Sequence, residues 1–282
     1  MTTLVPLETL SDEAQGAALS LPPALEMLYG PLRLPAHPGQ PYIIANFVST
    51  LDGVVALNEP GAKGGGEISG FNQHDRAVMG LLRAIADVVI VGAGTLRSVP
   101  NHLWTARHIY APLADAYQQL RSALGKTQPP LNVIVSARGE VDLSLPVFQS
   151  GAVPTLLLTT AAGAERLQAQ RPPPALAIIA AGSSPTISAQ TIIEEVQRMR
   201  TNGVILVEGG PQLIGDFFAE QRLHELFLTF APQVAGRDSS TERPGLVAGK
   251  RFAPEHPLWG RLISIKRGGS HLFLRYAFEA AG

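Results

Sequence analysis

Short apolar runs alternate with helical patterns along most of the chain. The runs are rich in Val, Ile and Leu and lack polar alternation, which is typical of strands that are buried on both faces. They predict strands over residues 42–47, 88–91, 131–135, 155–158, 176–180 and 204–207. We expect these strands to lie parallel in one sheet that helices cover on both sides.

Helical spacing is clear in two of the segments between these runs. Apolar residues recur every three or four positions over residues 72–86, where Arg76 and Arg83 lie seven positions apart and therefore on one helix face. Ser188 is the expected N-cap of a second helix, which buries apolar side chains up to Met199. The alternation of strands and helices predicts an α/β fold.

The pattern changes near the C-terminus, where strands follow one another without long helices between them. Three such strands are expected, over residues 225–230, 262–266 and 272–276. They predict an antiparallel edge on a mainly parallel sheet. An unpaired edge strand can pair with another chain, so we expect a homodimer.

The first 40 residues are rich in proline and show no sustained hydrophobic period. We interpret residues 1–40 as an extension that wraps the domain surface, with one short helix near residues 24–29. The remaining residues, 41–282, are long enough to form one large α/β domain. Residues 61–66, which are rich in glycine, are expected to form a loop.

Charge and cysteine content narrow the range of partners. The 22 basic and 23 acidic residues give a net charge of −1, and no block of Lys and Arg is present, which argues against nucleic acid as a partner. Because the chain has no cysteine, a deaminase site with cysteine-bound zinc is excluded. The seven histidines form no H-E-x-x-H motif and no cluster with carboxylates, so no metal is expected.

No segment indicates export or membrane insertion. The N-terminus lacks a basic region followed by an apolar one, and no apolar run approaches the ~20 residues that span a bilayer. We therefore expect a cytoplasmic protein that does not bind membranes.

Two glycine-rich turns follow predicted strands. Residues 92–95 read Gly-Ala-Gly-Thr, and residues 208–211 read Glu-Gly-Gly-Pro. In an open α/β sheet, ligands bind beyond the carboxyl ends of the strands, where glycines admit phosphate to the backbone and helix N-termini supply N–H groups. Both turns are therefore candidate cofactor sites, and Pro211 opens a helix that could accept an anion.

Each turn also has a purely structural interpretation. The first turn lacks the third glycine of a dinucleotide-binding fingerprint, because Arg97 occupies that position, and a glycine pair after a strand also suits a tight turn. Glu208 in the second turn also suits a solvent-exposed glutamate that the helix dipole favours. The glycine–lysine pairs of the chain lack the context of a Walker loop.

Four motifs, taken in order, resemble the reductase domain of the bifunctional riboflavin-biosynthesis deaminase/reductase. They are Ser-Thr-Leu-Asp-Gly at residues 49–53, Leu-Arg-Ala at residues 82–84 and the two glycine-rich turns, and residues 225–228 add a similar strand. The likeness covers residues 41–278. It implies a dihydrofolate-reductase-like fold, with three α/β/α layers, a mainly parallel mixed sheet and an antiparallel C-terminal edge. It also implies NADPH-dependent reduction of a ribosylaminopyrimidine 5-phosphate to its ribityl form, here in a stand-alone reductase.

The resemblance implies cofactor contacts at both turns and after the strand over residues 131–135. By position, the contacts are Ser49, Gly92, Gly94, Thr95, Ser136, Arg138, Gly209, Gly210, Pro211, Gln212 and Leu213. Ser136 matches a position near the adenosine 2′-phosphate, and Arg138 would supply the charge that selects NADPH over NADH. A plain polar loop over residues 136–139 is the alternative.

On the substrate side, the resemblance implies contacts from Arg83, Arg107 and Glu208. Arg83 suits a phosphate or a ribose, with a surface ion pair as its alternative, whereas Glu208 suits a hydroxyl or a ring N–H. A proton must also reach the reduced product. Glu208, Asp52 or a bound water are the candidates for the catalytic acid.

The departures from the family pattern fall on the substrate side. The acidic residue that usually follows Gly-x-Gly-Thr is absent, and the match at Arg107 needs an insertion. This pattern fits a paralogue that retains NADPH while its substrate has changed. Three alternatives stay open: a reductase of dihydrofolate or another pteridine-like heterocycle, a non-catalytic NADPH-binding module, and a purely structural subunit.

Overall fold

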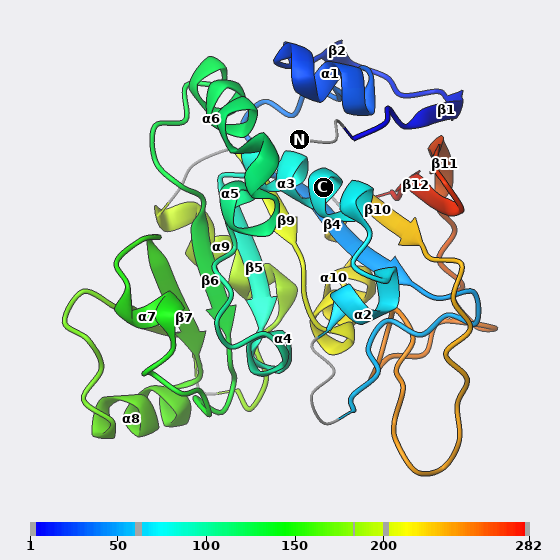
Figure 1. Ribbon diagram of the computed structural model, residues 1–282. Coiled ribbons are helices and arrows are strands. Elements are labelled where there is room, and N and C mark those ends of the chain that lie inside the picture. Colours follow the sequence, from blue (N-terminus) through cyan, green and yellow to red (C-terminus); the bar gives the residue numbers. More distant parts are fainter. Residues whose placement is uncertain (1–3, 60–63, 183, 200–202, 280–282) are drawn as a thin grey trace.

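One ten-stranded sheet runs through the molecule (Figure 1). The computed structural model describes residues 4–59, 64–182, 184–199 and 203–279. The strands of the sheet are β1 Glu8–Asp12, β4 Tyr42–Ser49, β5 Val88–Gly92, β6 Leu131–Val135, β7 Thr155–Thr159, β8 Ala177–Ala180, β9 Val204–Val207, β10 Glu225–Phe230, β11 Arg261–Gly268 and β12 His271–Ala277. Their spatial order is β1, β11, β12, β10, β4, β9, β5, β6, β7, β8. A separate ribbon pairs β2 (Ala17–Ala18) with β3 (Arg33–Leu34).

The sheet is parallel from β10 through β4, β9, β5, β6 and β7 to β8. The strands β12, β11 and β1 continue it in antiparallel pairing. Every strand expected from the sequence is present, and only the ends differ, as where β4 continues to Ser49 and β8 begins at Ala177. The predicted α/β fold, with a mainly parallel sheet and an antiparallel edge, is confirmed.

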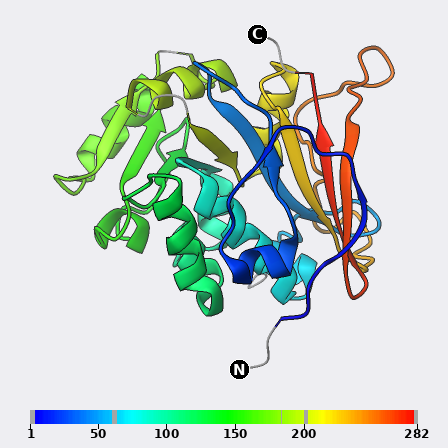
Figure 2. The same cartoon turned by 90° about the horizontal axis from the view of Figure 1, so that it is seen from above.

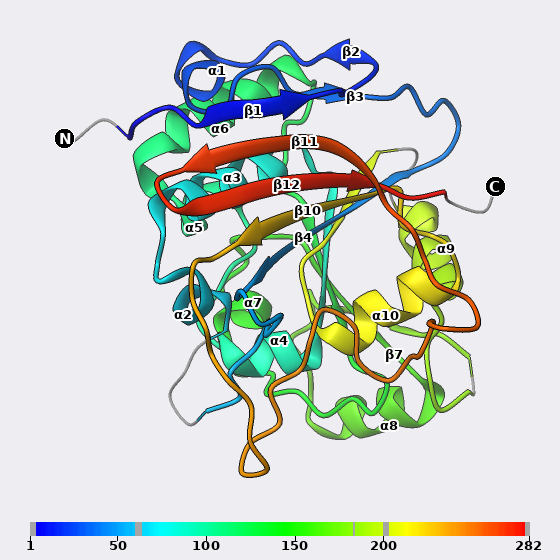
Figure 3. The same cartoon turned by 90° about the vertical axis from the view of Figure 1, so that its right-hand side faces the viewer.

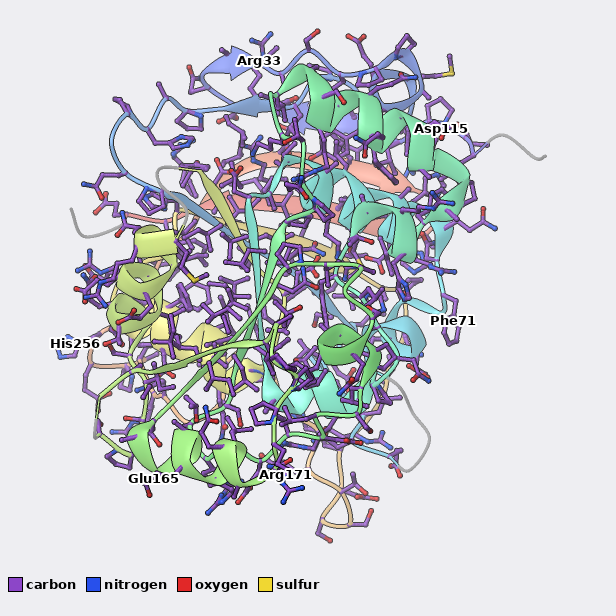
Figure 4. All side chains as sticks on the ribbon, turned by 90° about the vertical axis from the view of Figure 1, so that its left-hand side faces the viewer. Arg33, Phe71, Asp115, Glu165, Arg171 and His256 are labelled. Atoms are coloured by element: carbon purple, nitrogen blue, oxygen red, sulfur yellow. The ribbon has the colours of Figure 1, made fainter. Side chains whose placement is uncertain are left out.

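Helices cover both faces of the sheet (Figures 1 and 3). They are α1 Pro23–Tyr29, α2 Gly65–Ser69, α3 Gln73–Ile85, α4 Ala93–Ser98, α5 Ala106–Ile109, the 3₁₀ turn η1 Ala111–Leu113, α6 Ala114–Ala123, α7 Pro146–Gln149, α8 Ala161–Ala169, α9 Ala189–Met199 and α10 Pro211–Ala219. Successive strand residues point to opposite faces, so Ile44 joins the core with α3, and Ile43 joins the core with α9 and α10. Helix α8, marked by Glu165 in Figure 4, lies at the end of the molecule opposite Arg33 of β3.

Helix α3 carries several of the side chains that matter below. The side chain of Asn72 caps this helix, because it accepts a hydrogen bond from the backbone N–H of Asp75 at 3.1 Å. Asp75, Met79 and Arg83 follow at four-residue intervals, so they share one face of the helix. That face lies toward the carboxyl ends of the parallel strands.

The N-terminal extension contains more structure than the sequence pattern predicts. The expected short helix is present as α1, but the extension also supplies β1, which pairs with β11 and forms the edge of the sheet (Figure 2). The side chains of β1 are almost all exposed, so no apolar pattern marks this strand. The antiparallel edge that was expected to be open is therefore covered, which removes the reason for expecting a homodimer through β11.

A buried lysine ties the extension to the sheet. Lys266 of β11 is 1% exposed, and its Nζ donates a hydrogen bond to Thr9 Oγ1 at 2.9 Å. The same ammonium lies 4.8 Å from the centre of the Tyr29 ring of α1. Burial lowers the pKa of Lys266. Contacts from both β1 and α1 thus compensate for the burial of this charge.

Some details differ from the predictions. Met199 is the last residue of α9 and is 45% exposed, so the buried face of this helix ends at Val196. The expected glycine-rich loop is only partly described, because residues 61–63 lie outside the described residues and α2 already begins at Gly65. Within the described ranges, every helix is too short or too polar to cross a lipid bilayer.

Candidate functional site

A large cavity opens at the carboxyl edge of the parallel strands. Its volume is about 1120 Å³, which exceeds the ~300–1,000 Å³ of ordinary small-molecule pockets. Its walls come from the ends of β4, β5 and β6, from the turn after β9, from α2, α3 and α4, and from the start of α10. Helices α2, α4 and α10 mark this edge in the lower half of Figure 1. The cavity is therefore where an open α/β sheet binds its ligands.

The two glycine-rich turns touch each other in the wall of this cavity. A Cβ atom on Gly209 would lie only 2.5 Å from Thr95 Oγ1, and a Cβ on Gly92 would lie 3.7 Å from the Gly209 carbonyl oxygen. Gly210 has a φ of +70°, which residues with side chains rarely adopt. Because these positions carry no side chain, the backbones of the two turns approach each other closely in the cavity wall, and we call this arrangement the glycine cradle.

The start of α10 completes the glycine cradle. Gly210 precedes the first helical residue, Pro211, and no side chain caps the helix, so its first backbone N–H groups are available to a ligand. Gln212 and Leu213, which carry these N–H groups, line the cavity. Such a helix start beside glycines fits the pyrophosphate of a nicotinamide dinucleotide.

Residues at the end of β6 form another part of the same cavity. Ser136 is 4% exposed, whereas the Arg138 side chain is 75% exposed and pairs with Glu140 at 3.0 Å. Arg166 of α8 also contacts Glu140 at 3.0 Å. Exposed ion pairs of this kind contribute only about 0–1 kcal/mol. Either arginine can therefore exchange Glu140 for another anion at little cost.

Arg83 and Glu208 are partners of each other. Both side chains are 2% exposed, and Arg83 Nη2 lies 2.8 Å from Glu208 Oε2, while Arg83 Nε donates to the same oxygen at 2.9 Å. Arg83 Nη1 donates to His102 Nε2 at 2.8 Å and to the Thr105 carbonyl at 3.3 Å. The Glu208 side chain is thus not solvent-exposed, and Arg83 forms a buried ion pair instead of a surface one, while both residues line the cavity.

His102 extends this buried cluster. Because an arginine can only donate, His102 Nε2 must accept, which places the ring proton on Nδ1. Burial, followed by the nearby charge of Arg83, lowers the pKa of His102 to about 2. His108 packs edge-on against His102, with ring centres 4.5 Å apart, and burial also lowers its pKa. Within the described residues, no group of three or more histidines and acids could hold a metal ion.

The cavity also contains residues that the motifs do not indicate. Asp75, Arg76, His102 and His108 all line it. For Asp75 a signal exists in the sequence, since it lies eight positions before Arg83 and therefore on the same helix face. The two histidines lie in an irregular segment, where no spacing rule points to a common site.

Ser49 and Arg107 are predicted site residues that do not line the cavity. Ser49 is 5% exposed, and its hydroxyl donates to the Thr50 carbonyl at 3.0 Å. Arg107 is exposed on α5, and the next residue, His108, lines the cavity instead. The insertion needed to align Arg107 is consistent with this shift of position.

Asp52 also lies outside the cavity wall, where it joins two loops. Its Oδ1 accepts hydrogen bonds from Thr50 Oγ1 at 2.6 Å and from the N–H of Ala235 at 3.1 Å, and its Oδ2 accepts one from the N–H of Gly236 at 2.7 Å. The Thr50 hydroxyl, together with these backbone groups, lowers the pKa of Asp52 to about 2. A carboxylate held in this way is a poor proton donor.

Several solved structures share this fold at low sequence identity. A pyrimidine reductase-like protein from Corynebacterium diphtheriae matches 90% of this chain and 98% of its own, with a TM-score of 0.66 and 21% identity. A diaminohydroxyphosphoribosylaminopyrimidine deaminase/5-amino-6-(5-phosphoribosylamino)uracil reductase from Thermotoga maritima matches 85% of this chain and 57% of its own, with a TM-score of 0.59 and 18% identity. The riboflavin biosynthesis reductase Rib7 of Saccharomyces cerevisiae matches 87% and 93%, with a TM-score of 0.55 and 13% identity.

At these identities, the likeness shows the fold alone, which is the dihydrofolate-reductase-like arrangement that the sequence resemblance implies. Comparison with curated proteins gives no match. The family model of the RibD C-terminal domain, in contrast, matches residues 41–264, which form most of the chain. The chain therefore belongs to the RibD C-terminal domain family.

Proposed function

We propose that this chain is an NADPH-dependent reductase of the riboflavin-biosynthesis type, which transfers a hydride to a ribosylaminopyrimidine 5-phosphate or a related heterocycle. One observation carries the proposal: a single cavity joins the glycine cradle, which suits nucleotide phosphates, to the buried Arg83–Glu208 pair, which suits a polar substrate. Membership of the RibD C-terminal domain family supports the same activity. We assign it to residues 41–282, with residues 1–40 as the extension.

The nucleotide side of the cavity suits NADPH. The pyrophosphate would meet the glycine cradle, and the adenosine end would lie near Ser136. Arg138 and Arg166 would bind the 2′-phosphate in place of Glu140, and NADH lacks this group. When bound, the reduced nicotinamide supplies the hydride.

The substrate side combines one polar acceptor with a positioning arginine. Because its donors are committed to Glu208, His102 and the Thr105 carbonyl, Arg83 fixes the Glu208 carboxylate in one orientation. Glu208 keeps acceptor capacity for a substrate hydroxyl or ring N–H. Fixed orientation of this kind is how a reductase holds a carbon close to its hydride donor.

A cytoplasmic location and a homodimer are further parts of this proposal. With β11 covered by β1, a dimer would use β1 itself or another surface.

Nucleotide titration tests the cofactor assignment. We expect NADPH to bind more tightly than NADH, and Arg138→Ala to weaken NADPH binding about tenfold or more while NADH binding changes little, because a charge-assisted hydrogen bond contributes about 1.5–3 kcal/mol. Equal affinity for the two nucleotides in the unmodified protein would remove the support for NADPH.

Steady-state assay with the ribosylaminopyrimidine phosphate tests the activity. Glu208→Gln keeps the shape of the side chain, so we expect lower turnover with nearly unchanged NADPH affinity. Equal losses of turnover and NADPH affinity would contradict the assignment of Glu208 to the substrate. Tight NADPH binding without turnover of any heterocycle would favour a non-catalytic module.

A further inference from the structure

The carboxyl group of Asp75 also lies in the wall of the cavity. The residue is 4% exposed and belongs to the first turn of α3. The hydroxyl groups of Ser69 on α2 and Thr229 on β10 hydrogen-bond to its side chain. Within the described part of the chain, no cationic side chain forms an ion pair with Asp75, which separates it from Glu208.

The surroundings of Asp75 favour the protonated acid. Burial raises its pKa, and the negative charge of Glu208, from the turn after β9, acts in the same direction. The hydrogen bonds from Ser69 and Thr229, and His271 of β12, act in the opposite direction and are outweighed. Asp75 is thus a buried carboxyl group in the cavity wall whose surroundings raise its pKa, as in carboxyl groups that donate a proton.

The spacing along α3 leaves room for a substrate between Asp75 and the Arg83–Glu208 pair. Asp75 and Arg83 are eight residues apart on one helix face, which separates their Cα atoms by about 12 Å along the axis. Met79 lies between them and also lines the cavity. A substrate lying along this face would meet a fixed acceptor at one end and an acid at the other.

We propose that Asp75 is the proton donor of the reduction, a role that rests on the proposed reductase function. With a reduced nicotinamide nucleotide as reductant, hydride adds to C1′ of the ribosyl group, and the bond between C1′ and the ring oxygen breaks. The electron pair of that bond stays on the oxygen, which takes the proton of Asp75 and becomes a hydroxyl group. Solvent returns one proton to Asp75, so each turnover consumes one hydride and one proton.

The substitution Asp75→Asn tests this role, because it keeps the shape of the side chain but removes the proton. We expect kcat to fall about 100-fold or more, as for loss of a general acid, with NADPH affinity unchanged. In the unmodified enzyme, kcat/KM should decline as rising pH removes the proton from Asp75. This decline should be absent from the residual activity of the variant. Asp115→Asn, at an exposed position on α6 (Figure 4), is the matched control and should behave as the unmodified enzyme.

A second readout does not depend on turnover. When the pKa of an acid is higher in the folded than in the unfolded state, the free energy of unfolding falls as the pH rises above about 4. The reason is that the unfolded state then releases a proton that the folded state still holds. The unfolding free energy of Asp75→Asn should therefore rise relative to that of the unmodified protein as the pH rises from about 4 to about 8. A purely structural, ionised Asp75 would leave this difference nearly constant above about pH 5, because both states would then have released the proton.

The outcomes separate the donor role from the function on which it depends. If the unmodified protein is active and Asp75→Asn is equally active, the donor role is wrong and the reductase function stands. An ionised Asp75, revealed by a stability difference that stays constant above about pH 5, overturns the donor role as well. If the unmodified protein binds NADPH but reduces no heterocycle, the proposed function fails, and the donor role fails with it.

Discussion

At the scale of single residues, the buried Arg83–Glu208 pair is the most constrained part of the site. Two charges that are each 2% exposed have lost their hydration, and their mutual attraction and hydrogen bonds must compensate for that loss. A buried pair is weak evidence for added stability, but it makes the removal of one partner costly. The pair therefore links the integrity of the fold to the geometry of the substrate side.

Replacing Arg83 with methionine should show this link. The change leaves Glu208 buried without its cation, so we expect the free energy of unfolding to fall by about 3–5 kcal/mol. Urea unfolding measures the change. Arg97→Ala, at an exposed cavity residue outside this pair, is the control and should stay within about 0.5 kcal/mol of the unmodified protein. A similarly small effect at Arg83 would mean that water reaches the pair.

His102 should make stability depend on pH. Its pKa is about 2 in the folded protein, so below about pH 6.5 the unfolded chain binds a proton that the folded state does not. The contribution of neutral His102 to the free energy of unfolding is therefore fully present above about pH 6.5. It is lost as the pH falls, by up to about 1.4 kcal/mol per pH unit. His102→Gln, which keeps an acceptor for Arg83, should reduce this slope by that amount in urea unfolding between about pH 4 and about pH 6. Identical slopes for the two proteins would show that His102 is protonated in the folded state.

At the scale of elements, the contact between the two glycine-rich turns sets the shape of the nucleotide side. The turns follow β5 and β9, which are neighbours in the sheet, so their approach is a direct result of strand order. Gly209 is the position where this approach is tightest, since a Cβ would lie 2.5 Å from Thr95 Oγ1 and 2.9 Å from Thr95 Cβ.

The variant Gly209→Ala should therefore separate the two turns. We expect NADPH affinity to fall at least tenfold while the far-UV circular dichroism spectrum is retained. Gly245→Ala is the control, because a Cβ there would meet no atom closer than 3.5 Å. Unchanged NADPH affinity in Gly209→Ala would mean that the nucleotide binds elsewhere.

The strands that are buried on both faces could be predicted from the sequence, whereas the exposed strand β1 could not. The strands β5, β6 and β9 are continuous apolar runs, so their positions follow from composition alone. The strand β1 has exposed side chains and is defined by backbone pairing with a segment far away in the chain, which no local pattern records.

The same distinction applies to the candidate site. Residues of the glycine-rich turns, such as Gly92 and Gly209, could be predicted because they directly follow strands whose carboxyl ends meet at one edge. The mutual pairing of Arg83 and Glu208 could not, because it depends on how α3 packs across the sheet, whereas the helix spacing from Arg83 does point to Asp75. At Asp52 the carboxylate has the residue type of an acid catalyst, but it serves a loop contact.

At the scale of the whole molecule, the extension and the C-terminal strands form one unit. Besides the pairing of β1 with β11, Lys266 joins them through Thr9 on β1 and the Tyr29 ring on α1. Because the Lys266 ammonium is buried, water cannot take the place of a lost partner, and the loss lowers the free energy of unfolding.

Thr9→Val should test the strength of this connection. The change keeps the shape of the side chain but leaves the Lys266 ammonium without its hydroxyl partner, so we expect a loss of about 1–3 kcal/mol in unfolding free energy. Glu8→Gln on the same strand is the control, since Glu8 and Arg267 form an exposed ion pair that contributes about 0–1 kcal/mol. Equal effects of the two substitutions, measured by urea unfolding, would show that Lys266 keeps a solvent contact.

The pairing of β1 with β11 also has a consequence for synthesis on the ribosome. Glu8 lies opposite Arg267, so β1 leaves the ribosome more than 250 residues before its partner strand exists. At translation rates of roughly 5–20 residues per second, this delay lasts on the order of ten to fifty seconds. During this time β1 stays unpaired in the nascent chain. A product that ends before β11 would leave β1 without a partner strand permanently.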